Sequence, residues 1–213
     1  EHTINPCKRN EDTTPRQKAL QLTDMLSTIF EFTDIQRAIL IKYIKNGYDE
    51  FGDRLSFELL TKTIARDFDK RSSDSKTLGA LVNRFEMISG DIFGDENSIS
   101  LDELTNGLVC LDVSKIENNH LRNMVMLAVL QHIYNTMLSR QQNQIYQPDG
   151  DVQLIIMIDE AGRIASSDHS VATRLVKESG KFKIGLFFGI QDIPDIDSKI
   201  LSNYGFVFVH QLT

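Results

Sequence analysis

The sequence predicts an α/β protein in which a helical region precedes a parallel sheet covered by helices. From Pro15 to about Phe93, apolar residues recur at three- and four-residue spacing, which is typical of amphipathic helices. After Leu101, short runs rich in Val, Ile and Phe alternate with helical stretches, which is the order expected of parallel strands joined by crossover helices. We therefore expect a mainly helical region over residues 1–107 and a sheet-containing part over residues 108–213.

Four amphipathic segments predict a small helical bundle in the first region. Their apolar residues fall within residues 20–30, 35–44, 57–68 and 78–88. Thr33-Asp34 is a favourable N-cap ahead of the second segment, because a Thr side chain can accept a hydrogen bond from a free helical N–H. Asn46-Gly47 predicts the end of the same helix, since both residue types are common just past a helix.

Strands and helices alternate in the second region. The predicted elements are a strand at Leu108–Asp112, a long helix at Leu121–Arg140, a strand at Val152–Ile158, a helix at Val171–Ser179, a strand at Ile184–Gly189 and a strand at Phe206–Val209. Four strands with crossover helices make half or more of a doubly wound sheet. The ligand site of such a sheet is expected at the carboxyl ends of its strands.

Composition narrows the class of protein. With 41% hydrophobic and 25% charged residues, the chain has the balance of a soluble globular protein. No apolar run approaches the roughly 20 residues that span a bilayer. Cys7 and Cys110 fit no metal-ligand spacing, so we expect a reduced, cytoplasmic protein. The net charge of -7 counts mildly against a DNA-binding surface, although a basic channel can coexist with an acidic exterior.

Two adjacent carboxylates give the sharpest chemical signal. The apolar run Leu154–Ile158 ends in Asp159 and Glu160. A buried strand would deliver Asp159 to the sheet edge, where its carboxylate could hold Mg²⁺ directly or through water. Glu160 could then orient and deprotonate the attacking water in phosphoryl transfer. The alternative is a core strand that simply ends at solvent, where acidic residues are common.

A glutamine follows the next predicted strand. Ile184–Gly189 leads into Ile190 and Gln191, which places Gln191 at the carboxyl end of a neighbouring strand. An amide both donates and accepts hydrogen bonds, so Gln191 could sense a γ-phosphate or an attacking water. The alternative is a loop glutamine that is hydrogen-bonded to the backbone.

Together, several stretches resemble the second half of HerA-type ATPases and of their FtsK and conjugation-ATPase relatives. In chain order they are Ile158-Asp159-Glu160-Ala161, Lys177-Glu178-Ser179-Gly180-Lys181-Phe182, Gly189-Ile190-Gln191-Asp192-Ile193-Pro194-Asp195-Ile196-Asp197 and Phe206-Val207-Phe208. The resemblance implies a RecA-like P-loop fold that uses ATP and Mg²⁺. It also implies that Asp159 binds the metal, that Glu160 activates water and that Gln191 links nucleotide state to motion.

The sequence departs from this family at three points, one of which is Gly162, where relatives often place a histidine. It contains no Gly-x-x-x-x-Gly-Lys-Ser/Thr loop to cradle phosphates, and we expect that loop upstream of a fragment boundary. This fragment alone is therefore expected to be inactive. Gly180 stands where relatives often carry an arginine that acts on a neighbouring subunit's nucleotide, and Arg163 and Arg174 are the candidates to replace it.

The leading functional hypothesis is an ATP-hydrolysing DNA translocase or helicase-type motor. The resemblance implies a homo-hexameric ring on duplex DNA, with a nuclease or a conjugation component as a further partner. Two alternatives stay open. The chain could be a catalytically inactive interaction or assembly module, or it could belong to a secretion or conjugation ATPase that acts on protein or nucleoprotein.

Overall fold

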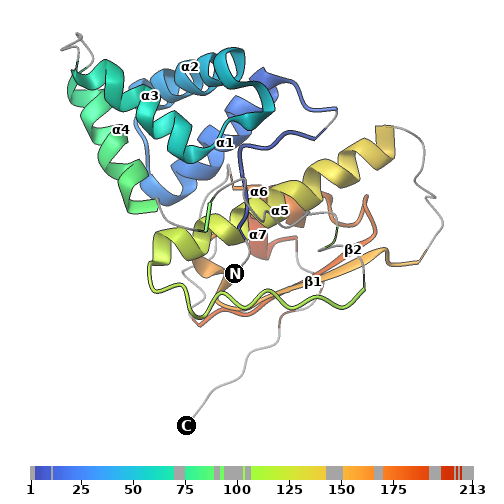
Figure 1. Cartoon of the computed structure of the whole chain (residues 1–213). Helices are drawn as coiled ribbons and strands as arrows, with labels where there is room; N and C mark the ends of the chain where they lie inside the picture. The colour runs from blue at the N-terminus through green and yellow to red at the C-terminus, as the bar shows by residue number, and fades with distance from the viewer. Residues whose placement is uncertain are drawn as a thin grey trace. The chain divides into compact units, whose positions relative to one another are not determined.

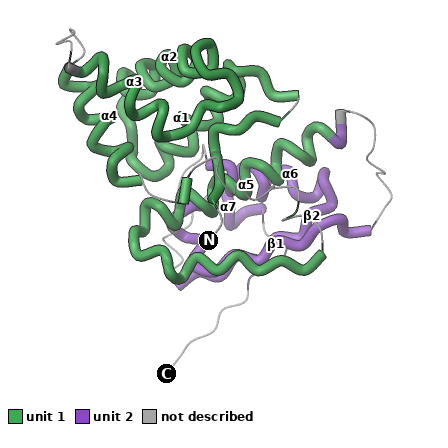
Figure 2. Tube along the Cα trace, viewed as in Figure 1, with its two compact units in different colours: residues 1–139 green, residues 140–213 purple. Residues whose placement is uncertain are grey.

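The chain forms two compact units, residues 1–139 and 140–213 (Figure 2). The computed structural model describes residues 3–10, 12–69, 75–88, 92–93, 103, 107–142, 151–165, 170–191, 198–203, 205 and 207. The first unit contains α1 (Pro15–Phe30), α2 (Asp34–Phe51), η1 (Gly52–Arg54), α3 (Phe57–Asp69), α4 (Ser75–Ile88) and most of α5 (Asn119–Gln142) (Figure 1). The second unit contains β1 (Leu154–Ile158), η3 (Ala161–Arg163), α6 (Val171–Glu178), β2 (Ile184–Phe188) and α7 (Ser198–Leu201). The functional boundary predicted after residue 107 stays a prediction.

The first two helices begin with reciprocal side-chain caps. The Thr14 hydroxyl accepts from the Gln17 N–H at 3.3 Å, and the Gln17 side chain accepts from the Thr14 N–H at 2.9 Å. Thr33 and Gln36 form the same pair at the start of α2, at 3.3 and 3.0 Å. Each pair satisfies N–H groups that a helix start leaves without partners. The N-cap predicted at Thr33 is confirmed.

The helix end predicted at Asn46-Gly47 is wrong, because α2 continues to Phe51. Gly47 is buried, and a Cβ atom on it would lie 2.8 Å from Cδ1 of the fully buried Leu55. The glycine therefore makes room for Leu55 inside the helix rather than ending it. The helix stops at Gly52, whose φ of 58° is easily adopted only by glycine.

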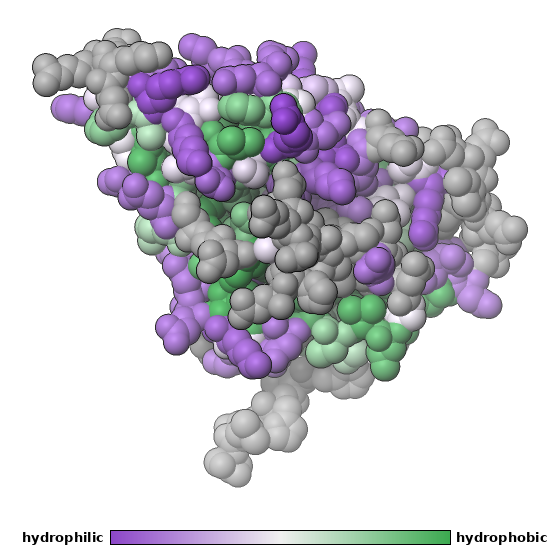
Figure 3. Space-filling model, in the orientation of Figure 1, coloured by the Kyte–Doolittle hydropathy of each residue, from purple (hydrophilic) through white to green (hydrophobic). Residues whose placement is uncertain are grey.

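A tightly buried apolar core holds the first unit together. The Phe57 ring meets the edges of Phe85 and Phe93, with ring centroids 5.7 and 5.4 Å apart. Such edge-to-face pairs add to the stabilisation that comes from burial. Other side chains of this core are less than 2% exposed: Leu22, Leu26, Leu40, Ile44, Leu60, Ile64, Leu78, Leu81 and Ile88. The outward surface over α2 is hydrophilic, as its periodicity predicts (Figure 3).

A partly buried polar link joins α1 to α5 within this unit. Gln21 and Asn135 exchange two amide hydrogen bonds, at 3.0 and 3.1 Å. Gln131 also donates to the Asn135 side-chain oxygen, at 2.9 Å. Buried amides must find partners, so this link fixes one register of α5 on α1.

None of the helices in the described part of the chain is both long and apolar enough to cross a bilayer.

The strand predicted at Leu108–Asp112 does not form. Leu108 is fully exposed and Val109 is 44% exposed, and neither takes part in a ladder. An apolar run becomes a strand only where a neighbouring backbone pairs with it, and the described residues supply no such neighbour. The run instead ends in a turn, in which the Asp112 carboxylate accepts from the Ser114 N–H at 2.9 Å. A hydrogen bond with the Ser114 side chain, together with this bond from the Ser114 N–H, lowers the pKa of Asp112.

The second unit is built on a β-α-β arrangement. β1 and β2 pair in parallel, with Leu154 opposite Ile184 and Ile158 opposite Phe188 (Figure 1). Parallel neighbours need a crossover connection, and α6 lies within it. The strands and the helix predicted here are confirmed, and the protein is a mixed α/β protein. A wider RecA-like sheet stays a prediction, because the strand predicted at residues 206–209 lies outside the described residues except for Val207.

The helix α6 begins with a serine cap and is buried along one side. The Ser170 hydroxyl accepts from the Ala172 N–H at 3.2 Å, as expected of an N-cap. Val171 and Leu175 are buried, whereas several apolar residues of the two strands are not. The exposed fractions of these strand residues are 59% for Ile155, 77% for Met157 and 54% for Phe187.

Candidate functional site

Three of the predicted site residues lie at the carboxyl ends of two adjacent parallel strands. Asp159 and Glu160 follow β1 directly, and Gly189-Ile190-Gln191 follows β2. Because Ile158 is opposite Phe188, the next residues, Asp159 and Gly189, lie side by side. The prediction that Gln191 follows the strand next to the Asp159 strand is confirmed. The chemical roles of these residues stay predictions.

Backbone hydrogen bonds tie the two strand ends together. The Gly189 N–H donates to the Ile158 carbonyl at 2.8 Å, and the Ala161 N–H donates to the Gly189 carbonyl at 2.9 Å. Gly189 is therefore hydrogen-bonded to the last residue of β1 through its N–H and to the turn after β1 through its carbonyl. Any shift at Gly189 must strain or break one of these bonds.

Glu160 adopts an unusual backbone conformation within this turn. Its φ and ψ are 54° and 37°, which is the left-handed region. That region costs an ordinary residue roughly 1–2 kcal/mol, because Cβ crowds the following carbonyl oxygen. Strain of this kind concentrates at functional sites. The turn thus keeps an exposed carboxylate at a position where glycine would be the more stable choice.

The Asp159 carboxylate is fixed by its own turn. Its Oδ1 accepts from the Glu160 N–H at 3.0 Å. Asp159 and Glu160 are both exposed residues.

The two carboxylates at this edge are oxygen ligands of the kind that Mg²⁺ accepts. Mg²⁺ prefers oxygen ligands and is usually held by one or two carboxylates, with waters and phosphate oxygens completing its shell. Within the described ranges, no group of three or more His, Cys, Asp or Glu side chains could hold a metal ion.

Sequence reasoning missed Gly189 as a site residue. A Cβ atom built on Gly189 would lie 2.7 Å from Oδ1 of Asp159, which is closer than real Cβ atoms come to other heavy atoms. A glycine between an apolar strand and Gln191 was visible in the sequence. Its meaning depends on the pairing register, which places it against Asp159.

The structure leaves the two candidate arginines without an established role. Arg163 is the last residue of η3, and its side chain lies outside the described part of the chain. Arg174 lies in α6, where its backbone N–H donates to the Ser170 carbonyl at 3.1 Å. The action of either residue on a nucleotide stays a prediction.

Comparison with known proteins gives one distant similarity. No family profile matches the chain. It is similar to the DNA import protein CedB of Sulfolobus acidocaldarius, with 21% identity over 180 residues. The matched region covers 83% of this chain and 28% of that protein. The chain therefore spans little more than a quarter of the length of the curated relative that it matches.

Proposed function

We propose that this chain is part of an ATP-hydrolysing motor that moves DNA, with Asp159, Glu160 and Gln191 in its hydrolytic site. The observation that carries the proposal is the pair of carboxylates at the end of β1, beside the Gly189–Gln191 segment at the end of β2. The distant similarity to a DNA import protein supports the DNA-handling part of the proposal. The resemblance to HerA-type ATPases supports the use of ATP.

Each of the three side chains has a distinct task in this proposal. Asp159 supplies an oxygen ligand to Mg²⁺, which when bound offsets the negative charge that develops on the transferred phosphoryl group. Glu160 accepts a proton from the attacking water, and its exposure leaves it accessible to that water. Gln191 orients the water or the terminal phosphate through its amide. A cradle for the phosphates must come from a segment that this sequence does not contain, or from an adjoining subunit.

The decisive experiment is Glu160→Gln in the full-length protein. The amide keeps the size of the side chain but cannot accept the proton, so nucleotide binding should persist while hydrolysis falls. General-base contributions are typically about 10²- to 10⁴-fold, which sets the expected loss of kcat. The measurements are steady-state ATP hydrolysis and binding of a fluorescent ATP analogue.

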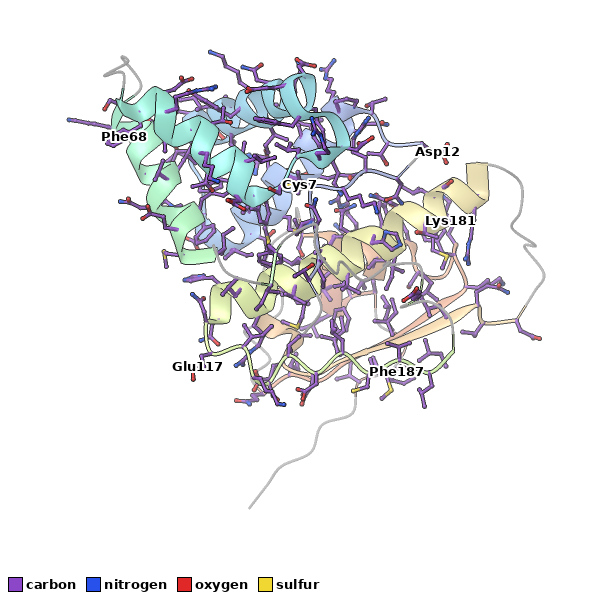
Figure 4. The ribbon with its side chains drawn as sticks, viewed as in Figure 1. Cys7, Asp12, Phe68, Glu117, Lys181 and Phe187 are labelled. Atoms are coloured by element: carbon purple, nitrogen blue, oxygen red, sulfur yellow. The ribbon has the colours of Figure 1, made fainter. Side chains whose placement is uncertain are left out.

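Glu117→Gln is the matched control. Glu117 is an exposed residue of the first unit, labelled in Figure 4, and it has no part in the proposed chemistry. We expect this variant to hydrolyse ATP at the parental rate. Parental turnover by Glu160→Gln would show that Glu160 is not the base.

A second candidate, an inactive assembly module, is favoured by one observation. The 213 residues contain no Gly-x-x-x-x-Gly-Lys-Ser/Thr loop. This candidate predicts that the full-length protein has no ATPase activity that depends on Asp159 or Glu160. The same measurements therefore separate the two candidates.

A further inference from the structure

The two strand ends leave no room for a side chain at Gly189. A Cβ atom there would lie 2.7 Å from Oδ1, 3.5 Å from Cα and 3.7 Å from Cγ of Asp159. The first of these separations is not sterically possible. Any side chain at position 189 therefore has to displace either the Asp159 carboxylate or the backbone that carries it.

Neither of these groups can move without losing a hydrogen bond. The Asp159 carboxylate accepts from the Glu160 N–H, so rotating it away from Gly189 gives up that bond. The Gly189 backbone is bonded through its N–H to Ile158 and through its carbonyl to Ala161. Moving the end of β2 instead would break these two hydrogen bonds. The carboxylate thus fits its position only because residue 189 has no side chain.

We propose that Gly189 is a positioning residue, whose missing side chain holds the Asp159 carboxylate in the orientation that binds a divalent cation. Gly189 acts through Asp159 and contacts neither nucleotide nor metal in this proposal. The identification of the cation rests on the function proposed above. The steric part of the proposal rests only on the geometry of the two strand ends.

The same strand provides a matched control, Gly185. A Cβ atom on Gly185 would lie 3.5 Å from Ile155 Cγ1, with the next atoms at 3.9 and 4.0 Å. These are ordinary van der Waals separations, so a methyl group fits at Gly185. Gly185→Ala and Gly189→Ala are thus the same change, four residues apart, and only the second meets the carboxylate.

The test measures cation binding in the full-length protein. Mn²⁺ serves as the probe and is followed by electron paramagnetic resonance in the presence of a non-hydrolysable ATP analogue. Loss of a group that orients a metal ligand typically costs about 10- to 100-fold in metal affinity, and we expect that loss for Gly189→Ala. The Mg²⁺ concentration for half-maximal ATP hydrolysis should rise in parallel, with kcat at saturating Mg²⁺ changed much less. Gly185→Ala should bind Mn²⁺ within about twofold of the parent.

A double-mutant cycle with Asp159→Ala separates the steric inference from the proposed function. Asp159→Ala removes the oxygen that the new methyl group would meet, so adding Gly189→Ala to it should weaken Mn²⁺ binding no further. If Gly189→Ala fails to fold, recovery of folding in the double variant would support the same steric cause, and failure of both would overturn it. If Asp159→Ala weakens Mn²⁺ binding while Gly189→Ala binds like Gly185→Ala, the inference about Gly189 is wrong. If Asp159→Ala itself binds Mn²⁺ normally, the proposed cation site is wrong and the inference fails with it.

Discussion

The helix starts of the first unit and the turn after β1 in the second unit differ in backbone conformation. Thr33 sits in extended geometry, and its side chain satisfies a free N–H of α2. Glu160 sits in the left-handed region, which a glycine would occupy without strain. The helix starts of the first unit therefore favour stability, whereas the turn after β1 keeps a carboxylate at a conformational cost, as does the end of α1 at Glu31, whose φ is 49°.

The largest effect is expected in the core of the first unit. Phe85 is 1% exposed and packs edge-to-face with Phe57. Replacing Phe85 by Ala leaves a cavity, and such changes typically cost about 3–5 kcal/mol of unfolding free energy. Urea denaturation followed by circular dichroism measures the loss, and hydrogen exchange assigns it to residues 1–139.

Phe68→Ala is the control for this loss. Phe68 is 38% exposed, so the same truncation should cost clearly less (Figure 4). Equal losses for the two variants would contradict the view that burial in this core stabilises the unit.

Lys18 is a residue of the first unit whose burial lowers the stability of the folded state at neutral pH. Its side chain is buried, and burial lowers its pKa from 10.5 to about 8, with Cys7 opposing part of the shift. The folded state therefore favours the neutral amine. Above about pH 10.5 the lysine is neutral in both states and carries no penalty, whereas below about pH 8 it carries the full penalty. At 1.36 kcal/mol per pKa unit, that penalty is about 3 kcal/mol.

Lys18→Met should accordingly stabilise the first unit at pH 7 by up to about 3 kcal/mol. The gain should shrink as the pH rises from about 8 to about 10.5, because the parent loses its penalty over that range. Urea unfolding of both proteins at pH 7 and pH 10 measures the difference. A gain that is the same at both values would show that Lys18 is not held with a lowered pKa.

The smallest expected effect is the change in stability when a left-handed residue is replaced by glycine. Two residues with the same φ allow this comparison. Glu160 and Lys183 both have φ of 54°, and Lys183 directly precedes β2, at the opposite end of the strand from Gly189. Replacing either residue by Gly relieves the left-handed strain but adds freedom to the unfolded chain. The net stabilisation is expected to be up to about 1 kcal/mol. Thermal unfolding measures it.

The two glycine variants should differ in activity. Glu160→Gly in the full-length protein should be more stable but lose ATP hydrolysis, whereas Lys183→Gly should gain stability and keep its rate. If Glu160→Gly destabilises the protein, the conflict between stability and function at this turn does not exist.

Elements governed by neighbouring residues could be predicted from the sequence. The cap at Thr33 depends on Gln36, three residues away, and both are readable in the chain. The strand before Asp159 is a short apolar run, and it forms as predicted. These features needed no knowledge of distant contacts.

Elements that depend on distant contacts could not be predicted in this way. Gly47 has the signature of a helix end, but its position is set by Leu55, which packs against it from beyond the helix. Leu108–Asp112 has the composition of a strand but lacks a paired backbone among the described residues. Gly189 is the same kind of case at the site, because only the register of β1 on β2 places it against Asp159.

The exposed apolar residues in and next to the two strands have a practical consequence for handling the protein. Val152, Ile155, Met157 and Phe187 are each more than half exposed. Parallel strands are normally covered on both faces, and uncovered apolar patches next to open strand edges promote self-association. Preparations of the second unit by itself should therefore precipitate as concentration rises, and a soluble sample will need either a covering segment or charged replacements on this face.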